Sequence, residues 1–264
     1  MATPFLELPH GIPDSNTFRR VFGRIAPEAL SKYLYDWLGC HWEKSTVVAI
    51  DGKTIWGIKS KIHKAHHVVS AFAAENQMAI GELVTEEKSN EVMAVPDLLD
   101  ALNVAGSIVT ADAMSCQKRI VQKIQDSQAN YVIGLKRNQP ALLEDVSLYS
   151  QEFSHELPCL VTMDKDHGRI EKRKYRLLTS LSWLPESSEW AGLKAVGCVC
   201  STVTRNGATS TDTCFFITSL TDINRFSYVA RKHWSIENQL HWSLDVIFEE
   251  DSSRVRKKYV PPST

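Results

Sequence analysis

Residues 46–53, which read TVVAIDGK, constrain the fold more than any other stretch of the chain. A short apolar run rich in β-branched residues is typical of a strand that is buried on both faces. The run ends on Asp51 and Gly52, so a carboxylate stands at the tip of a rigid strand, where a metal ligand would be held firmly. The Asp-Gly pair also suits a tight hairpin turn. The choice between a site and a turn depends on whether other carboxylates converge on Asp51.

The composition is that of an ordinary globular protein with enough residues to bury a core. The chain has 264 residues, of which 43% are hydrophobic and 23% are charged, and its formal net charge is −1. No apolar run approaches the roughly 20 residues that cross a bilayer, and the first residues lack the pattern of a signal peptide. The six cysteines form no CxxC pair and no zinc-binding spacing, so we expect reduced thiols and a cytoplasmic location.

Basic residues are concentrated in one segment although the whole chain is close to neutral. Residues 165–176 contain six lysines and arginines against two acidic residues. The near-neutral total argues mildly against a nucleic-acid binder, whose affinity comes largely from neutralised phosphates. A local basic patch can still bind phosphate, but a solvated charged face gives the same pattern. The two interpretations stay open until a site is found beside the segment.

The apolar patterning predicts a mixed α/β fold. Ser15 or Asn16 can cap a first helix, and Pro27 can open a second one. Residues 157–221 are typical of strands and turns, with a hairpin turn at Asn206-Gly207. Elsewhere we expect strands in residues 46–51, 67–73, 78–85, 107–111 and 131–135, helices in residues 90–102, 116–125 and 140–148, and a long helix from Asp222 to Phe248.

This order of elements, β-β-β-α-β-α-β, predicts an RNase H-like α/β domain with a mixed five-stranded sheet and flanking helices. A β-rich insertion interrupts it before the last helix. The predicted organisation is a helical segment in residues 1–44, a catalytic domain in residues 45–156 and 222–258, and the insertion in residues 157–221.

Three carboxylates are expected to converge at one end of this sheet. The fourth strand ends on Asp112, and in such a sheet it lies beside the first strand, which ends on Asp51. The last helix crosses that end and carries Glu237, which the spacing of Ile236 and Leu240 leaves at the edge of the buried face. Neighbouring carboxylates repel one another, and divalent cations remove that conflict. Two Mg²⁺ ions about 4 Å apart can stabilise both the attacking and the leaving oxygen of a phosphoryl displacement.

Several segments together resemble the DDE transposases of bacterial insertion sequences, specifically the H-repeat-associated proteins of Rhs loci. The resemblance extends from about Gly11 to Arg256. It is carried by AIDGKT (49–54), HVVSAF (67–72), EEKSNEVMAVPDLL (86–99), IVTADAMSCQK (108–118), YVIGLKRNQ (131–139), HGRIEKR (167–173) and HWSIENQLHWSLDVIFEEDSSRVR (233–256).

The resemblance implies that Asp51, Asp112 and Glu237 are the catalytic residues of an RNase H-like domain. They would hold two Mg²⁺ or Mn²⁺ ions, with Asp51 bridging both. The implied reaction is hydrolytic cleavage of transposon ends in double-stranded DNA, followed by attack of the freed 3′-hydroxyl on target DNA. A homodimer in a DNA complex at the bacterial nucleoid would fit this activity. The DNA-binding residues implied are Lys53, Lys136, Arg169, Lys172, Arg173, Arg231 and His233.

The sequence also departs from the family pattern. Trp56 stands where relatives often have a basic residue, Arg137 stands where a small one is common, and Leu244 replaces the lysine of a Tyr/Arg/Glu/Lys signature. Both ends look short beside the relatives, so we expect little or no transposition by this chain alone. Two other functions stay open: an RNase H-like nuclease that acts on other nucleic acid, and a non-catalytic transposase remnant.

A second group of acidic residues follows Glu237 on the last helix. Solvation or helix capping explains this group better than a metal site does, although carboxylates suit both roles. The group consists of Asp245, Glu249, Glu250 and Asp251.

Overall fold

The computed structural model describes residues 11–26, 29–30, 33–34, 37, 46–56, 66–85, 91–153, 158–166 and 168–252. The chain divides into two compact units, one formed by residues 1–42 and 255–264 and the other by residues 43–254. In the first unit, helix α1 (Ser15–Phe22) is capped by Asp14, whose carboxylate accepts from the Asn16 amide at 2.7 Å. The predicted caps are therefore wrong by one or two residues. The second predicted helix lies largely outside the described residues.

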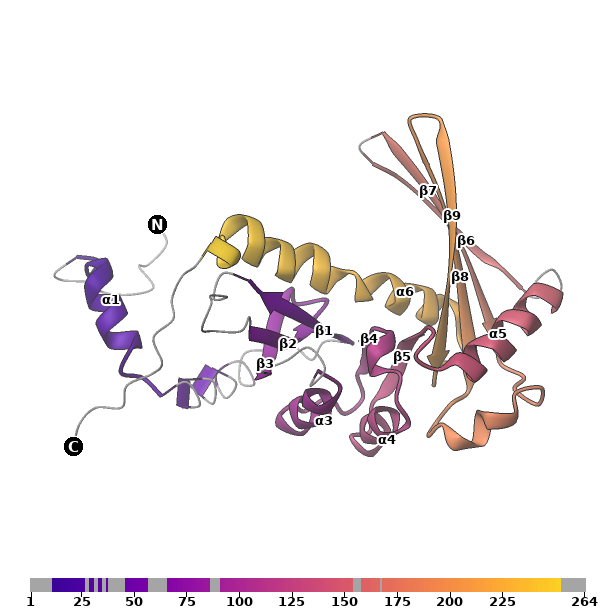
Figure 1. Ribbon diagram of the computed structural model, residues 1–264, viewed down its shortest axis with the longest axis horizontal. Coiled ribbons are helices and arrows are strands. Elements are labelled where there is room, and N and C mark those ends of the chain that lie inside the picture. Colours follow the sequence, from indigo (N-terminus) through magenta and orange to yellow (C-terminus); the bar gives the residue numbers. More distant parts are fainter. Residues whose placement is uncertain are drawn as a thin grey trace, which may run out of the picture. The chain divides into compact units, whose positions relative to one another are not determined.

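The second unit is built on one mixed sheet of nine strands, ordered β3-β2-β1-β4-β5-β9-β8-β7-β6 (Figure 1). The strands are β1 (Val47–Ile55), β2 (His66–Ala73), β3 (Met78–Thr85), β4 (Ile108–Ala111), β5 (Asn130–Leu135), β6 (Leu160–Asp166), β7 (Arg169–Leu178), β8 (Ala195–Arg205) and β9 (Ala208–Thr218).

Strands β1 and β4 are parallel neighbours, as the sequence predicts. Their register pairs Val47 with Ile108 and Ile50 with Ala111. Both strands are buried along this stretch, because apolar β-branched residues cover both of their faces. The residues that follow the last pair are Asp51 and Asp112, so the parallel register brings the two carboxylates side by side. The prediction that the first strand ends at Asp51, or turns there, was wrong, because β1 continues to Ile55 and Asp51 pairs with Ser70 of β2.

The prediction of five strands was wrong in number, because strands of the predicted insertion continue the same sheet. Strand β9 pairs antiparallel with β5 from Val132↔Thr218 to Leu135↔Phe215. Without β9, β5 would be an edge strand with unpaired backbone groups, which β9 satisfies. Beyond this junction, β6 to β9 project past the helices as a twisted arm (Figure 1). The buried ends of β8 and β9 lie near the helices, and their remaining residues are more exposed.

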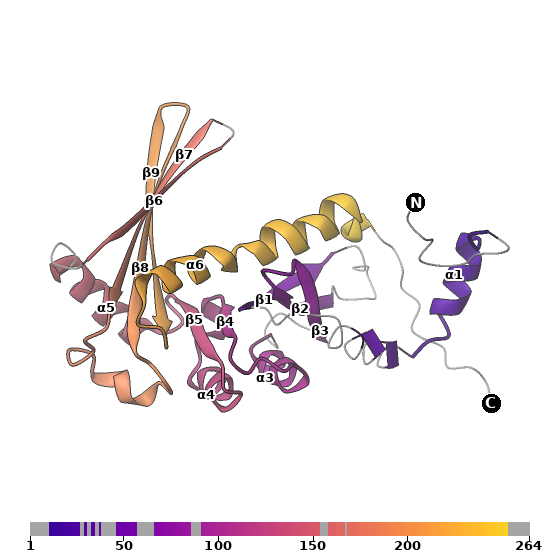
Figure 2. The same cartoon turned by 180° about the vertical axis from the view of Figure 1, so that it is seen from behind.

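Helices cover the two faces of the sheet (Figure 2). Helix α3 (Glu91–Ala101) contacts β2 and β3, and α4 (Lys118–Asp126) packs against α3 and β5. Helix α6 (Ile223–His233) lies on the opposite face, where it contacts β1, β4 and β7. Helix α5 (Pro140–Phe153) begins at the predicted proline. Among the described residues, no helix is both long and apolar enough to span a membrane.

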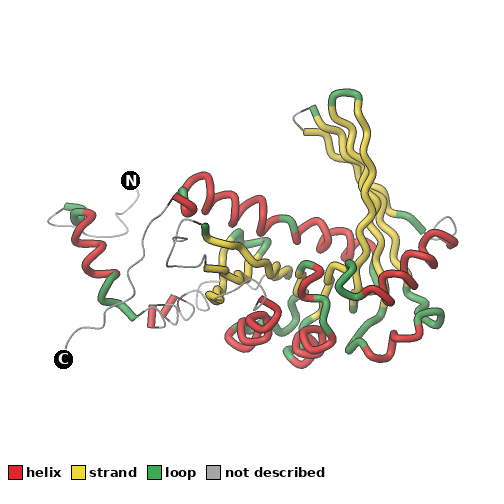
Figure 3. Tube along the Cα trace, viewed as in Figure 1, coloured by secondary structure: helices red, strands yellow, loops and turns green. Residues whose placement is uncertain are grey.

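The last helix starts as predicted and then changes its winding. Asp222 caps α6 by accepting a hydrogen bond from the Arg225 amide at 2.6 Å. The chain stays largely helical after Trp234 (Figure 3). This part consists of two π-helical segments, Ile236–His241 and Ser243–Ile247, and a short 3₁₀ turn, Glu250–Ser252. Glu237 lies on the first π-helical segment. π-helical turns are rare in proteins, and many of those that occur lie at functional sites.

Helix α6 is anchored in the main core of this unit. Phe226, Val229 and Ala230 are buried together with residues of β1, β4, β5, β7 and β8. A side chain at Gly197 on β8 would collide with the Phe226 ring, so the glycine allows helix and strand to approach closely. A smaller cluster of Ala49, Phe72 and Ile236 holds the start of the π-helical part.

Candidate active site

Asp51 and Asp112 are fixed by the strands that carry them. Side chains alternate along a strand, so Asp51 faces the last helix while Gly52 faces α3. Asp112 follows β4 and caps a 3₁₀ turn (Ala113–Ser115), because its Oδ1 accepts a hydrogen bond from the Met114 amide at 2.9 Å. Both carboxylates therefore have defined positions where the pairing of β1 with β4 ends.

Glu237 shares its surroundings with these two aspartates. Burial raises the pKa of Glu237, and the charge of Asp112 raises it further, while Lys136 acts in the opposite direction. The charges of Asp112 and Glu237 also reach Asp51. The three predicted catalytic residues thus form one electrostatically coupled group.

The pKa of Asp51 is strongly affected by its surroundings. Burial, followed by the charges of Asp112, Glu237 and Glu91, raises its pKa from 3.8 to about 7, against the lowering effect of a hydrogen bond from the Gly52 amide. A carboxyl group that is half protonated near neutral pH signals that this group of carboxylates tolerates its own negative charge poorly. A bound cation would remove that penalty.

The kind of donor fits Mg²⁺ or Mn²⁺, which prefer carboxylate oxygens. The positions of the side chains fit a metal ion less well than their chemical type does. The described residues include no group of three His, Cys, Asp or Glu side chains already spaced to hold a metal ion. Asp51, Asp112 and Glu237 therefore fit a divalent cation by donor type and by coupled charge, without forming a finished coordination shell.

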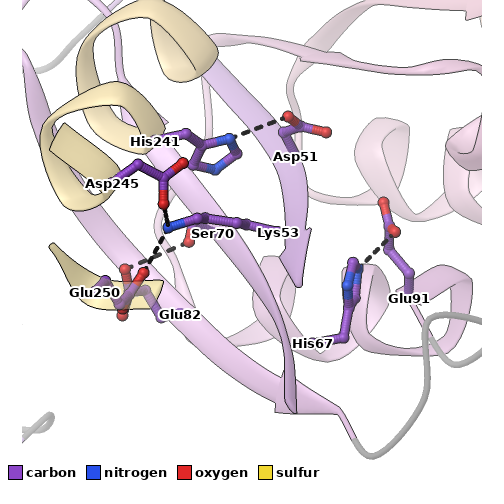
Figure 4. A network of polar contacts seen from close by, with 9 residues as sticks. All are labelled: Asp51, Lys53, His67, Ser70, Glu82, Glu91, His241, Asp245 and Glu250. Carbon is purple, nitrogen blue, oxygen red and sulfur yellow. Dashed lines mark hydrogen bonds and ion pairs between the residues drawn. The ribbon is translucent and has the colours of Figure 1, made fainter. Parts of the chain in front are cut away.

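Two residues beside Asp51 were missed by sequence reasoning. His241 places Nδ1 at 3.5 Å from Asp51 Oδ2, and burial together with the charge of Lys53 lowers its pKa, so its ring is neutral (Figure 4). Glu91 lies against the other side of β1, where a Cβ on Gly52 would come within 2.6 Å of its carboxylate. The spacing of four residues between Glu237 and His241 was a usable signal for the histidine. Nothing local pointed to Glu91.

Glu91 forms a buried pair with His67. The Glu91 Oε2 atom lies 2.8 Å from His67 Nε2 (Figure 4). On the other side of the ring, His67 Nδ1 lies 3.0 Å from the Thr54 hydroxyl. Both side chains are almost fully buried. This pair fills the space behind Gly52 and explains why the residue after Asp51 has no side chain.

Several of the predicted DNA-binding residues lie around one cavity that also contains Glu237. The cavity has a volume of about 300 Å³ and is lined by Arg169, Arg173, Arg231 and Trp234, among others. Glu171 holds two of these arginines side by side, with its Oε2 at 2.8 Å from Arg169 and 2.6 Å from Arg173. Basic side chains on β7 and α6 thus meet a predicted catalytic carboxylate.

The other predicted DNA-binding residues have different surroundings. Lys136 is close enough for its charge to act on both Glu237 and His233. Lys172 alternates with Arg173 along β7 and therefore lies on the opposite face of the sheet. Lys53 donates to two carboxylates of the last helix.

His233 is buried beside Asp112. Burial lowers its pKa to about 4, and its Nδ1 has no hydrogen-bond partner among the described residues. The ring is therefore neutral at physiological pH and offers no positive charge to a phosphate.

Fold and site together define a mixed α/β domain that collects carboxylates at the end of its central strands and arginines next to them. Residues 42–258 match the family model described as the transposase DDE domain. The chain therefore belongs to the DDE transposase family.

Individual relatives agree with this assignment. The protein YncI of Escherichia coli O157:H7, which is named as a transposase, is 36% identical over 94% of this chain and 67% of its own length. The H repeat-associated protein YhhI of Escherichia coli (strain K12) is 35% identical over 94% of this chain and 69% of its own length.

A solved structure of the piggyBac transposase synaptic complex with hairpin DNA gives a TM-score of 0.44 at 9% identity. The alignment covers 88% of this chain and 48% of that chain. This degree of likeness carries no argument about fold or function.

Proposed function

We propose that this chain cleaves DNA at transposon ends and joins the freed ends to target DNA, with Asp51, Asp112 and Glu237 as its catalytic carboxylates. The observation that carries the proposal is the neighbourhood of Asp51, where burial, and after it the charges of Asp112 and Glu237, raise the pKa of the Asp51 carboxyl to about 7. The order of the first five strands, β3-β2-β1-β4-β5, supports an RNase H-like catalytic domain. The family assignment supplies the class of reaction.

The roles of the carboxylates follow from their positions. Asp51, Asp112 and Glu237 would together hold two Mg²⁺ or Mn²⁺ ions, as the family resemblance implies. When bound, such ions supply a reactive oxygen nucleophile and stabilise the oxygen that leaves. Asp112 is kept in place by its hydrogen bond to the Met114 amide, and Glu237 by the burial of the adjacent Ile236.

We further propose that double-stranded DNA approaches along the arginine-lined cavity. Arg169 and Arg231 would contact the phosphates next to Glu237, and Lys136 would add a positive charge on the β5 side. Trp234, which is half exposed at this cavity, offers an aromatic face beside them. The DNA contact of Arg173, which already pairs with Asp164 and Glu171, stays a prediction from the sequence. The DNA contacts of Lys53, Lys172 and His233 stay predictions from the sequence.

Two transposon ends present two sites of cleavage. We therefore propose that two copies of the chain act in one DNA complex, at the bacterial nucleoid where the substrate lies.

The test is cleavage of a supercoiled plasmid that carries the DNA flanking this gene, with Mg²⁺ or Mn²⁺. The variant Asp112→Asn keeps the shape of the side chain and removes its charge, so we expect cleavage to fall by about 10³-fold with the fold intact. The matched control is Asp97→Asn, an exposed position on α3. Unchanged cleavage by Asp112→Asn would remove the two-metal mechanism.

The same assay separates the two alternatives. Cleavage that ignores the flanking DNA and accepts any nucleic acid would indicate a nuclease of the RNase H type. Absence of cleavage by the unaltered chain, with metal present, would indicate a non-catalytic relative.

A further inference from the structure

The part of the last helix that begins at Ile236 has little apolar contact with the rest of the unit. Ile236 is its only fully buried residue among positions 236–247, and Leu240 packs beside it. Val246, Ile247 and Phe248 are exposed. Burial of apolar surface therefore does not explain what keeps this end of the helix against the sheet.

Polar contacts to β1 supply that attachment (Figure 4). The Lys53 ammonium group donates to Asp245 Oδ1 at 2.6 Å and to Glu250 Oε2 at 2.6 Å, and only 11% of its side chain is exposed. Nearby, the Trp56 amide donates to Asp251 Oδ1 at 2.9 Å. Two turns of the helix and the 3₁₀ turn after it are thus tied to one strand.

The charge around Lys53 is unfavourable for a phosphate. Its ammonium group already has two carboxylate partners, and Glu82 stands close enough for the Glu250 charge to act on it. Asp251 adds a further carboxylate at Trp56. The positive charge of Lys53 is therefore matched by two carboxylates in contact with it, and Glu82 and Asp251 add negative charge to the same region, so an approaching DNA strand would meet net repulsion there.

The strand and the helix joined by Lys53 are the two elements that carry the proposed catalytic groups. Asp51 and Lys53 lie two residues apart on the same face of β1, and Glu237 lies about two turns before Asp245. His241, between them, already contacts Asp51. A lysine that fixes the far end of this helix also limits how far Glu237 can move from Asp51.

We propose that Lys53 is a positioning residue, which clamps the helix of Glu237 onto the strand of Asp51 through Asp245 and Glu250, and that it does not contact DNA. The inference rests on the proposed function for its catalytic consequence. The clamp itself is a property of the folded chain, so it can be tested without any cleavage.

The experiment compares three variants of the full chain: Lys53→Gln, the double variant Asp245→Asn with Glu250→Gln, and Lys53→Arg. Lys194→Gln, an exposed lysine elsewhere on the domain, is the control for losing one positive charge. The readouts are amide hydrogen exchange of residues 243–252, affinity for a plasmid fragment in EDTA, and the Mg²⁺ concentration that gives half-maximal plasmid cleavage.

We expect Lys53→Gln and the double variant to behave alike. Exchange at residues 243–252 should become about tenfold faster, because a partly buried charge pair is lost. DNA affinity in EDTA should stay within about twofold of Lys194→Gln, since no phosphate contact is removed. Half-maximal cleavage should need about tenfold more Mg²⁺, the usual cost of losing a group that orients a metal ligand. Lys53→Arg should restore all three values.

A DNA-binding role for Lys53 predicts the opposite pattern. Lys53→Gln would then weaken DNA binding beyond the control, and the double variant would tighten it by releasing the lysine. That result, or unchanged exchange in both variants, overturns the clamp. If the unaltered chain does not cleave the plasmid, the proposed function fails, while hydrogen exchange and DNA affinity still decide between the two roles of Lys53.

Discussion

The two halves of the last helix are held to the same sheet by different forces. In α6, Phe226, Val229 and Ala230 are buried in the main core and the contacts are apolar. After Trp234 the winding becomes π-helical and, beyond Ile236 and Leu240, the contacts to β1 are polar: Asp245 and Glu250 pair with Lys53, and His241 lies beside Asp51. The first half stabilises the core, and the second half carries side chains of the candidate active site. Glu237 stands just after the boundary, where a rigid anchor on one side meets a charge-dependent contact on the other.

The largest difference should appear when one aromatic residue is removed from each half. Phe226→Ala should lower the free energy of unfolding by about 3–5 kcal/mol, because the ring is fully buried against β8. Phe248→Ala should change it by less than about 0.5 kcal/mol, because that ring is exposed. Urea denaturation of both variants measures this contrast. Equal losses would mean that the second half is as much a part of the core as α6.

A smaller effect on the free energy of unfolding should follow from the ionisation of Asp51. Its pKa is about 7 in the folded chain against 3.8 ordinarily, so the folded state binds more protons between these values. Stability without metal should therefore fall as the pH rises from about 4 to about 7 and then level off. The variant Asp51→Asn cannot ionise at this position, so it should not lose stability in this way. At pH 8 it should be more stable than the unaltered chain by about 1–3 kcal/mol.

Thermal unfolding at pH 5 and pH 8, with EDTA and with Mg²⁺, measures the effect. Mg²⁺ should stabilise the unaltered chain at pH 8 and leave Asp51→Asn unchanged. The same pH dependence in both proteins would show that Asp51 does not bear the shared charge.

The smallest expected effect concerns the basic side of the cavity. Changing Arg169 and Arg231 to Ala should weaken DNA binding and reduce the slope of log affinity against log salt by about one unit per lost phosphate contact. Lys194→Ala is the matched control, because it removes one exposed positive charge that does not line the cavity. Fluorescence anisotropy from low to moderate salt measures the slopes. Equal slopes for the arginine variants and the control would assign the patch to a solvated face.

The sequence predicted those structural features that depend on residues close together in the chain. The apolar β-branched run before Asp51 and the shorter one before Asp112 predicted two buried strands, and β1 and β4 do lie side by side in parallel. Proline and aspartate marked the starts of α5 and α6. These features depend on propensities and caps within a few residues, which a single sequence contains.

Features that depend on distant pairing were not predictable in this way. The junction of β9 with β5 joins residues as far apart in the sequence as Val132 and Thr218, and strand alternation alone cannot select that partner. The family resemblance implied DNA binding by Lys53, and no local pattern indicated its two carboxylate partners, which lie almost 200 residues later. The change to π-helical winding at Ile236 was also missed, because the apolar spacing around Glu237 suits an ordinary helix as well.

The most direct test of the account is a crystal structure of the full chain soaked with MnCl₂, read by anomalous diffraction. The account predicts a Mn²⁺ peak within about 2.5 Å of carboxylate oxygens of Asp51, Asp112 and Glu237, because these residues are proposed to share the ions. It also predicts no peak at Asp245 and Glu250, because Lys53 already neutralises them in part. Mn²⁺ bound at Asp245 and Glu250, with none at Asp51, would contradict the central claim.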